Sequence, residues 1–262
     1  MRIFVCVKEV PDTTDVKIDP KTGTLIREGV PAILNPFDMS ALEEALQIKD
    51  EKPDTKVFVI SMAPPHAEKN LRQTIAMGAD EVYLITDRAF AGSDTLATSY
   101  TLATAIKHLG GADLIFTGKQ AIDGDTAQTG PGIAEWLGIP QVTFVKRIKE
   151  LRNDSIVVER STEVGYEVVE VKLPAVLTII KGDKDPRLPS LRGMLKAKKA
   201  TIKKLSAEDL PVDESLIGLD GSPTKVDKIF TPEKRAAGEK FEGEPDELAK
   251  IIVEKLKEMN IL

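Results

Sequence analysis

The sequence has a single cysteine, Cys6, and no apolar run long enough to span a bilayer. A lone cysteine excludes an internal disulfide, Cys-x-x-Cys redox chemistry and a cysteine-ligated iron–sulfur cluster. The two histidines, His66 and His108, have no Cys or His at metal-ligand spacing, so we expect no metal site. No nucleophile–base pair stands out, and no catalytic side chain is predicted. Any redox role must therefore belong to a bound organic cofactor.

An excess of basic charge is also missing. The chain carries 36 Lys and Arg against 42 Asp and Glu, a formal net charge of −6, and its pI is near 5.2. This balance argues against a nucleic-acid partner, because nothing neutralises phosphates in bulk. Residues 1–7 run directly into Lys8 and Glu9, without the long apolar region of a signal peptide. We therefore expect a cytoplasmic protein with no membrane insertion.

Apolar, β-branched segments alternate with helical ones in the first half of the chain. Near-continuous hydrophobicity predicts strands covered on both faces at 2–8, 56–62, 81–86 and 113–118. Helical spacing of apolar residues predicts helices at 40–49, 67–77, 94–109 and 132–137, several of them followed by glycine. This alternation predicts an α/β fold with a doubly wound, mainly parallel, Rossmann-like sheet.

The second half changes character. Four β-rich segments follow at 141–148, 155–161, 166–173 and 175–181, and the alternating positions among them predict that part of this region is an antiparallel extension. Residues 205–243 are rich in Pro, Gly, Asp and Glu, which is typical of an arm ordered by a partner. Residues 245–260 then predict an amphipathic helix. We divide the chain into a nucleotide-binding domain, 1–204, and an arm with a terminal helix, 205–262.

The loop 118–130 has the strongest local signal for ligand binding. It leaves a predicted strand and opens a helix, the place where ligands sit in open α/β sheets. Gly118, Gly124 and Gly130 allow a tight turn, and the helix start offers unpaired N–H groups to phosphate. Neither a Gly-x-Gly-x-x-Gly nor a Gly-Lys-Ser/Thr fingerprint is present. A nucleotide site and a merely capped loop are both compatible with these residues.

Three further segments have a functional and a structural interpretation. Thr95 and Thr98 lie on one face of a helix that Ser93 or Asp94 can cap, which suits either a pyrophosphate or a ligand-free cap. Asn35 precedes another helix and could bind a base or ribose, or only mark the helix entry. The basic run 196–204 is either a solvated face or a docking surface for an acidic partner.

Several blocks, in order and spacing, resemble the electron-transfer flavoprotein β (small) subunit. They run from residue 1 to about 204 and include Cys6-Val7-Lys8, Asn35-Pro36-Phe37, Ala76-Met77-Gly78-Ala79-Asp80, 118–130 and 186–199. The resemblance implies an adenine-nucleotide-binding domain and an obligate α subunit on which the 205–262 arm packs. It also implies that 186–199 contains a recognition loop for acyl-CoA or related flavin dehydrogenases, with Leu191 as its anchor beside Lys196, Lys198 and Lys199.

Residues 87–99 and the Asp-Gly-Asp-Thr-Ala-Gln version of the loop look most like the NADH-dependent, electron-bifurcating members. That likeness implies FAD in this subunit, NAD(H) as electron donor, and ferredoxin or flavodoxin as a low-potential acceptor. The alternative is a non-bifurcating carrier with AMP in the same site. The implied cofactor-binding residues are Cys6 (by its backbone), Asn35, Pro36, Phe37, Asp38, Met62, Asp94, Thr95, Thr98, Gly118, Lys119, Gln120, Ala121, Ile122, Asp123, Gly124, Asp125, Thr126, Ala127, Gln128 and Thr129.

Overall fold

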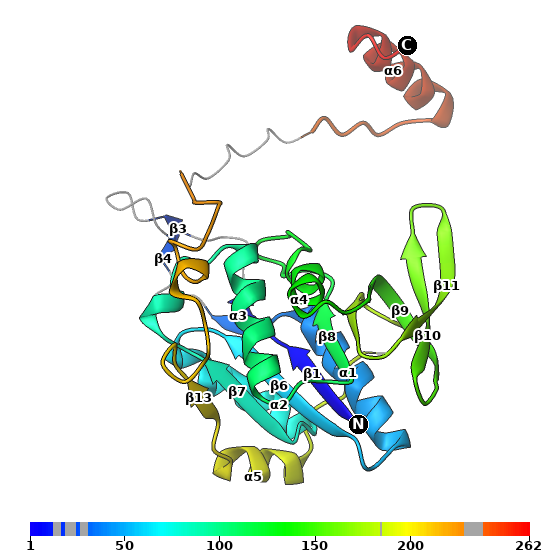
Figure 1. The fold of residues 1–262 in the computed structure, drawn as a ribbon. Coiled ribbons are helices and arrows are strands. Elements are labelled where there is room, and N and C mark those ends of the chain that lie inside the picture. Colours follow the sequence, from blue (N-terminus) through cyan, green and yellow to red (C-terminus); the bar gives the residue numbers. More distant parts are fainter. Residues whose placement is uncertain (13–16, 19–24, 27–30, 184, 228–237) are drawn as a thin grey trace.

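The computed structural model describes residues 1–12, 17–18, 25–26, 31–183, 185–227 and 238–262. Within these residues a nine-stranded sheet has helices on both faces, which confirms the predicted α/β class (Figure 1). Its strands are β1 (Arg2–Cys6), β6 (Lys56–Met62), β7 (Glu81–Ile85), β8 (Leu114–Gly118), β9 (Gln141–Leu151), β10 (Ser155–Thr162), β11 (Gly165–Lys172), β12 (Ala175–Ile179) and β13 (Lys203–Leu205). Two small sheets pair β2 (Glu9–Pro11) with β5 (Ala32–Leu34), and β3 (Lys17–Ile18) with β4 (Leu25–Ile26).

The helices follow the expected alternation closely. They are α1 (Pro36–Glu51), α2 (Glu68–Met77), α3 (Thr95–His108), α4 (Thr129–Leu137), α5 (Leu191–Lys199) and α6 (Pro245–Glu258), with short 3-10 turns at Pro65–Ala67, Arg88–Phe90 and Glu214–Leu216. Gly78 ends α2 with φ +135° and donates its amide to the carbonyls of Thr74 and Ile75. The sequence pattern predicted all of these α-helices except α5.

The strand order places a switch point at the centre of the sheet. The order is β11-β10-β9-β12-β8-β1-β6-β7-β13. From β1 the chain passes through α1 to β6 on one side, whereas β8 lies on the other side of β1, and both pairings are parallel. The loops that follow β1 and β8 therefore diverge to opposite faces, and the carboxyl ends of strands at such a switch point are where open α/β sheets bind ligands.

Two hydrophobic layers hold the sheet. One face packs α1, α2 and α5 through residues such as Leu42, Leu71 and Ala197, all of them buried. The other face packs α3 and α4 through residues such as Ile106 and Ile133, which are also buried. Because helices cover both faces, the central strands have no polar face, and this explains their unbroken apolar sequence.

The antiparallel extension comprises β9, β10 and β11, as the alternating pattern predicted. The remaining segment, β12, is buried along its whole length and lies parallel between β8 and β9. The long strand β9 thus joins the parallel sheet at one end and the antiparallel hairpins at the other. Its register against β12 shifts at a bulge near Phe144, where φ is +59°.

The C-terminal region has two parts. Strand β13 pairs with β7, and the chain from there to residue 224 stays against the domain, with Leu210 and Ile217 buried. Helix α6, which starts at the proline predicted for it, stands apart from the sheet and has no buried residue (Figure 1). None of the helices in the described ranges is both long enough and apolar enough to cross a membrane.

Candidate functional site

The residues predicted for the site collect at the switch point. Cys6 ends β1 and Met62 ends β6, while residues 118–129 connect β8 to α4. Residues 35–38 open α1, and Thr95 opens α3. All these elements meet the carboxyl edge of the sheet, so the sequence-distant blocks converge on this one edge (Figure 1).

The carboxylate of Asp38 ties the two diverging strand ends together. It is 6% exposed. Its Oδ2 accepts the amide of Lys8 at 2.8 Å, just beyond β1. Its Oδ1 accepts the amide of Gly118 at 3.0 Å, at the end of β8. Asp38 therefore holds the ends of β1 and β8 in place and does not offer free oxygen atoms to a ligand.

Burial has the largest effect on the pKa values of the neighbouring residues Asp38 and Cys6. Desolvation raises the pKa of Asp38 to about 7, against the hydrogen bonds from Lys8, Asn35 and Gly118, which favour the ionised form. Burial, and then the charge of Asp38, also raises the pKa of the Cys6 thiol far above its usual value. The Cys6 thiol is consequently protonated and is no nucleophile at neutral pH.

Asn35, like Asp38, uses its side chain to hold backbone segments in place. Its side chain is fully buried; Nδ2 donates to the carbonyl of Gln120 at 2.9 Å, and Oδ1 accepts the amide of Ile122 at 3.3 Å. Both ends of its amide group are thus used by the loop after β8. Asn35 shapes that loop, and the structure gives no free polar atom of Asn35 for a base or ribose.

Gly118 is required by this close packing. A Cβ at Gly118 would lie 2.4 Å from Asp38 Oδ1 and 2.7 Å from the Cβ of Phe37. Beyond it, Lys119 Nζ lies 5.4 Å from the ring centroid of Phe37 and 5.9 Å from that of Phe144. Phe144 is 37% exposed and has a left-handed backbone conformation. Its place beside Lys119 was not predicted, because in the sequence it looks like an ordinary strand residue.

The loop after Gly118 is folded by its own polar side chains. Lys8 Nζ forms an ion pair with Asp123 at 2.7 Å, and Gln120 Nε2 donates to Asp125 Oδ1 at 2.5 Å. Asp125 and Ala127 have φ of 51° and 55°. Left-handed conformations are costly for residues with a Cβ, so this loop stores strain of the kind found at ligand sites.

The loop presents a run of unpaired backbone donors. No group of the described residues accepts a hydrogen bond from the backbone amides of residues 126–130. They lead into α4, where Gln128 precedes the first helical residue and its side chain caps none of these amides. Successive free N–H groups at a helix start are the usual cradle of a phosphate. This run is the feature that best suits an anionic ligand.

Helix α3 begins beside this cradle. Its cap is Asp94, as one of the two sequence alternatives predicted, with Oδ1 accepting the amides of Leu96 and Ala97 at 2.9 and 3.1 Å. Thr95 Oγ1 donates to Gln128 Oε1 at 2.9 Å and so joins the two helix starts. Asp94 uses the amides of Leu96 and Ala97, and the Thr95 hydroxyl is donated to Gln128. The backbone amide of Thr95, which has no acceptor among the described residues, and the hydroxyl of Thr98 are therefore what α3 can offer a ligand.

A family model described as an electron transfer flavoprotein domain matches residues 22–210. The chain belongs to the electron transfer flavoprotein family. It is 53% identical to an electron transfer flavoprotein subunit beta of Thermoanaerobacterium thermosaccharolyticum, and the match covers 100% of both chains. It is 52% identical, again over 100% of both chains, to subunit CarD of the caffeyl-CoA reductase-Etf complex of Acetobacterium woodii. With protein FixA of Bradyrhizobium diazoefficiens it shares 46% identity over 90% of this chain and 84% of that one. These matches confirm the resemblance to β subunits.

In this electron transfer flavoprotein chain, the Leu191–Lys199 part of the block 186–199 is helix α5, where the resemblance implies only a recognition loop. Ser190 caps the helix by accepting the amide of Gly193 at 2.9 Å. This Ser followed by leucines at helical spacing was the signal that could have revealed the helix. A Cβ at Gly193 would lie 2.0 Å from the carbonyl oxygen of Ala76, so only glycine lets α5 approach the end of α2.

Helix α5 is fixed at both ends. Before it, Arg187 binds Glu43 through Nε at 2.8 Å and Nη2 at 3.0 Å, and its Nη2 reaches Asp50 at 2.7 Å. At its end, Arg72 Nη1 donates to the carbonyl of Ala197 at 2.7 Å. The hydrogen bonds from Arg187 outweigh burial and hold the pKa of Glu43 below its usual value.

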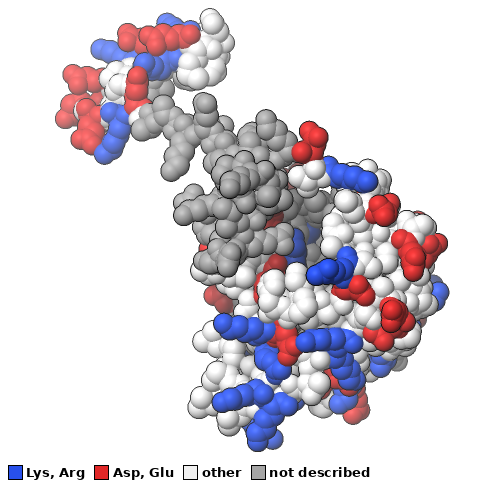
Figure 2. All heavy atoms as spheres, turned by 90° about the vertical axis from the view of Figure 1, so that its left-hand side faces the viewer, with Lys and Arg blue, Asp and Glu red and all other residues white. Residues whose placement is uncertain are grey.

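The outer side of α5 combines apolar and basic residues. The apolar ones are Leu188, Leu191, Met194 and Leu195, all exposed, with Leu191 at 78%. Lys196, Lys198 and Lys199 are exposed beside them, and Figure 2 shows basic side chains gathered on the lower part of this face. An exposed apolar cluster with a basic border, on a helix held this firmly, has the character of a docking surface.

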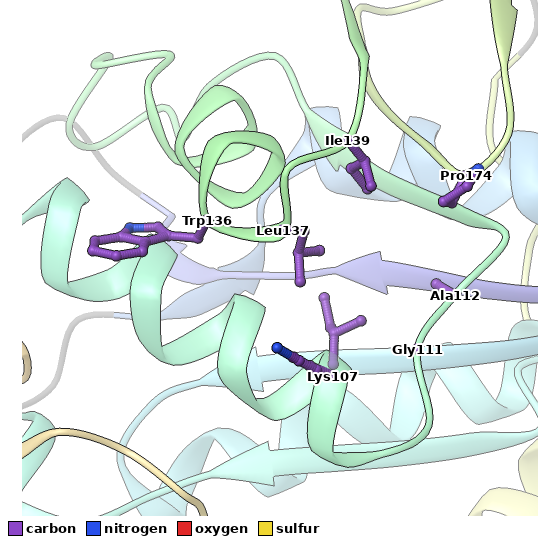
Figure 3. A pocket seen from close by; sticks show the side chains of 8 residues that line it. Lys107, Gly111, Ala112, Trp136, Leu137, Ile139 and Pro174 are labelled. Atoms are coloured by element: carbon purple, nitrogen blue, oxygen red, sulfur yellow. The ribbon is translucent and has the colours of Figure 1, made fainter.

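A separate cavity of about 220 Å³ lies at the opposite, amino-terminal edge of the sheet (Figure 3). The ends of α3 and α4 line it with Lys107, Trp136 and Leu137, and Pro174 closes one side. Its lining is largely apolar with a single cationic side chain. This composition does not suit a diphosphate, whereas the unpaired amides of 126–130 lie at the carboxyl edge.

Proposed function

We propose that this chain is an electron-carrying subunit that works beside an α subunit and binds FAD at its carboxyl-edge crevice. The observation that carries the proposal is the run of unpaired amides at 126–130, next to the hydroxyl of Thr95. Amides and hydroxyls are the donors that a diphosphate needs, and their place at the switch point is where such folds bind dinucleotides. The β-subunit names of the relatives support the α partner.

The chain's own contribution is to bind and to orient. Asp38 and Asn35 set the loop, Gly118 allows the backbone to approach, and the 126–130 amides with Thr95 and Thr98 would hold the diphosphate. The chemistry that FAD supplies when bound there is acceptance of a hydride from NADH, followed by division of the two electrons between different acceptors. With Cys6 buried and protonated, we assign no redox step to a side chain.

We further propose that this division is electron bifurcation. One electron would pass to the α-subunit FAD and on to a dehydrogenase, and the other to ferredoxin or flavodoxin. The starts of α3 and α4 are joined by the hydrogen bond from Thr95 to Gln128. Two adjacent helix starts would suit the diphosphate of a dinucleotide better than the single phosphate of AMP. The alternative is a non-bifurcating carrier with structural AMP in the same crevice.

The cofactor content of the native complex tests the proposal. We expect mass spectrometry of the released small molecules to find FAD from both subunits and no AMP. Titration with NADH in the absence of oxygen should then bleach the flavin absorbance. A complex containing AMP, with flavin only in the α subunit, would contradict bifurcation and establish the alternative. A cytoplasmic location, which cell fractionation can check, belongs to the same proposal.

The apolar cluster on α5 is proposed as the docking site for an acyl-CoA or related flavin dehydrogenase. The caffeyl-CoA reductase in the name of the Acetobacterium woodii relative's complex supports a partner that acts on CoA esters. Leu191 would be the anchor, because a 78% exposed leucine gains most from being covered by a partner.

Leu191→Ala is expected to slow electron transfer to the dehydrogenase by about tenfold or more, since loss of an interface anchor costs about 2 kcal/mol. Stopped-flow reduction of the dehydrogenase flavin measures the rate. Nucleotide content should be unchanged, because α5 and the crevice share no residue. Val164→Ala, which trims a 99% exposed residue on the β10–β11 turn, is the matched control. Wild-type kinetics in the Leu191 variant would remove the assignment.

Residues 205–262 are proposed to pack on the α subunit through α6. Ile252 is 56% exposed and Val253 42% exposed, so the apolar side of this helix is uncovered in the single chain. Amide hydrogen exchange in 245–258 should slow when the α subunit binds. Exchange that is equally fast in the complex would exclude the packing.

A further inference from the structure

The chain that follows β13 runs across the N-terminal part of helix α3 and the segment that precedes it. Leu205 accepts the amide of Thr86 at 2.9 Å, and the amide of Ala207 donates to Asp87 at 3.1 Å. Farther along, the amide of Asp213 donates to the hydroxyl of Tyr100 in α3 at 2.8 Å. Residues 203–224 are therefore attached to the β7–α3 connection by a series of contacts before the arm leaves the domain.

The last attachment is made to the cap of α3 itself. Thr224 donates twice to Asp94 Oδ2, through its amide at 3.0 Å and its hydroxyl at 2.7 Å. The amide of Asp94 donates to Ser222 Oγ at 2.8 Å, and this hydroxyl donates in turn to the carbonyl of Gly218 at 2.6 Å. Ser222 is 4% exposed. We call Asp94, Ser222 and Thr224 the latch.

The backbone beside the latch admits little change. Gly218 has φ +61°, and a Cβ there would lie 2.2 Å from the carbonyl oxygen of Ala89. Its amide donates to Ser93 Oγ at 3.1 Å. A Cβ at Gly92, where φ is +80°, would meet the Cβ of Leu219 at 3.1 Å. Two left-handed glycines thus let the two segments approach closely enough for the latch to form.

The latch occupies the acceptor oxygen atoms next to the proposed diphosphate. Asp94 immediately precedes Thr95, and a carboxylate with free oxygen lone pairs there would compete with phosphate for nearby donors. Its Oδ1 is satisfied by two amides of α3 and its Oδ2 by the two donors of Thr224. Burial alone would raise the pKa of Asp94, but these hydrogen bonds, with that of the Thr224 hydroxyl foremost, hold the pKa below its usual value. Asp94 is thus an ionised group whose acceptors are fully used.

We propose that Ser222 and Thr224 are positioning residues for the nucleotide: they complete the α3 cap, so that nucleotide binding and the attachment of the C-terminal arm strengthen each other. This inference rests on the proposed diphosphate site. Because coupling between two binding events is reciprocal, nucleotide should tighten the latch by the same factor by which the latch tightens nucleotide. Ser222 and Thr224 lie outside the blocks that carry the family resemblance.

The test uses the complete complex, freed of nucleotide and titrated with FAD. Thr224→Val removes one donor to an ionised group, which is expected to weaken FAD binding about tenfold. Thr224→Ser keeps the hydroxyl and should restore wild-type affinity. Thr201→Val, at an exposed threonine with no hydrogen bond among the described residues, is the matched control and should bind FAD normally.

Hydrogen exchange supplies the readout that a merely structural role would not move. In the wild type, FAD should slow amide exchange in the peptide 218–224, and Thr224→Val should abolish this slowing while exchange in β6 stays unchanged. Wild-type FAD affinity in Thr224→Val, or slowing that survives the substitution, would overturn the latch. If the wild-type complex itself binds no FAD, the diphosphate site fails instead, and the two failures are distinguishable.

Discussion

Gly118→Ala is expected to lower the free energy of unfolding by about 3 kcal/mol and to abolish nucleotide binding. The new Cβ would lie 2.4 Å from Asp38 Oδ1 and 2.8 Å from the Asp38 amide nitrogen. The nitrogen is backbone, and the oxygen belongs to a buried side chain that is held by hydrogen bonds. Relief of this overlap must break the hydrogen bond from Gly118 to Asp38, which sets the start of the loop. The loop that carries the 126–130 amides then loses its position.

Thermal unfolding with and without FAD measures both effects. A ligand at about a hundred times its dissociation constant stabilises a protein by about 2.7 kcal/mol, and we expect the Gly118 variant to lack this gain. Gly124→Ala is a sharp control in the same loop, because a Cβ there meets nothing within 4 Å. It should unfold like the wild type. If Gly118→Ala were as stable as Gly124→Ala, the close approach described here would be wrong.

Asp38→Asn is expected to change the pH dependence of stability. The folded-state pKa of Asp38 is raised to about 7 from an ordinary value of 3.8, chiefly by burial. Between these values the folded chain binds a proton that the unfolded chain has lost, so wild-type stability falls as pH rises from 4 to 7. Asparagine cannot titrate, and the variant should lack this fall, which amounts to at most about 4 kcal/mol.

The difference in stability between Asp38→Asn and the wild type should depend on pH. At pH 4 the variant should be less stable by about 1–3 kcal/mol, because its Nδ2 group cannot accept the buried amide that an oxygen accepts. As pH rises to 8, the difference should shrink and can reverse. Chemical denaturation at several pH values, with both proteins in the same buffers, measures it. A difference that is constant from pH 4 to 8 would mean that Asp38 is ionised throughout, held so by the amides of Lys8 and Gly118.

Several elements were predictable because their signals are local. Strands β1, β6, β7 and β8 have apolar residues on both faces, and α2 has a glycine stop after its last helical residue. Asp94 was one of two possible caps, and the structure selects it. Each of these depends on residues within a few positions of one another, where propensity and periodicity are informative.

The functions of Asn35 and Asp38 were not predictable in this way. Before a helix, both side chains look like caps or ligand contacts, yet each binds a segment 80 or more residues away. The docking of α5 has the same origin, since Gly193 is read correctly only beside the carbonyl of Ala76. A local pattern reports which groups are polar or small, but not which distant group they meet.

By itself the sequence determined the alternation of strands and helices, the glycine-rich loop after β8 and the family of the chain. All of these follow from the order of residues along the backbone. Only the tertiary structure decided that β12 enters the centre of the sheet, that the 126–130 amides lie free beside Thr95, and that Thr224 completes the cap of α3. The physical reason is that a hydrogen bond or a close contact depends on distance in space, and folding brings together groups that the sequence separates by 130 residues.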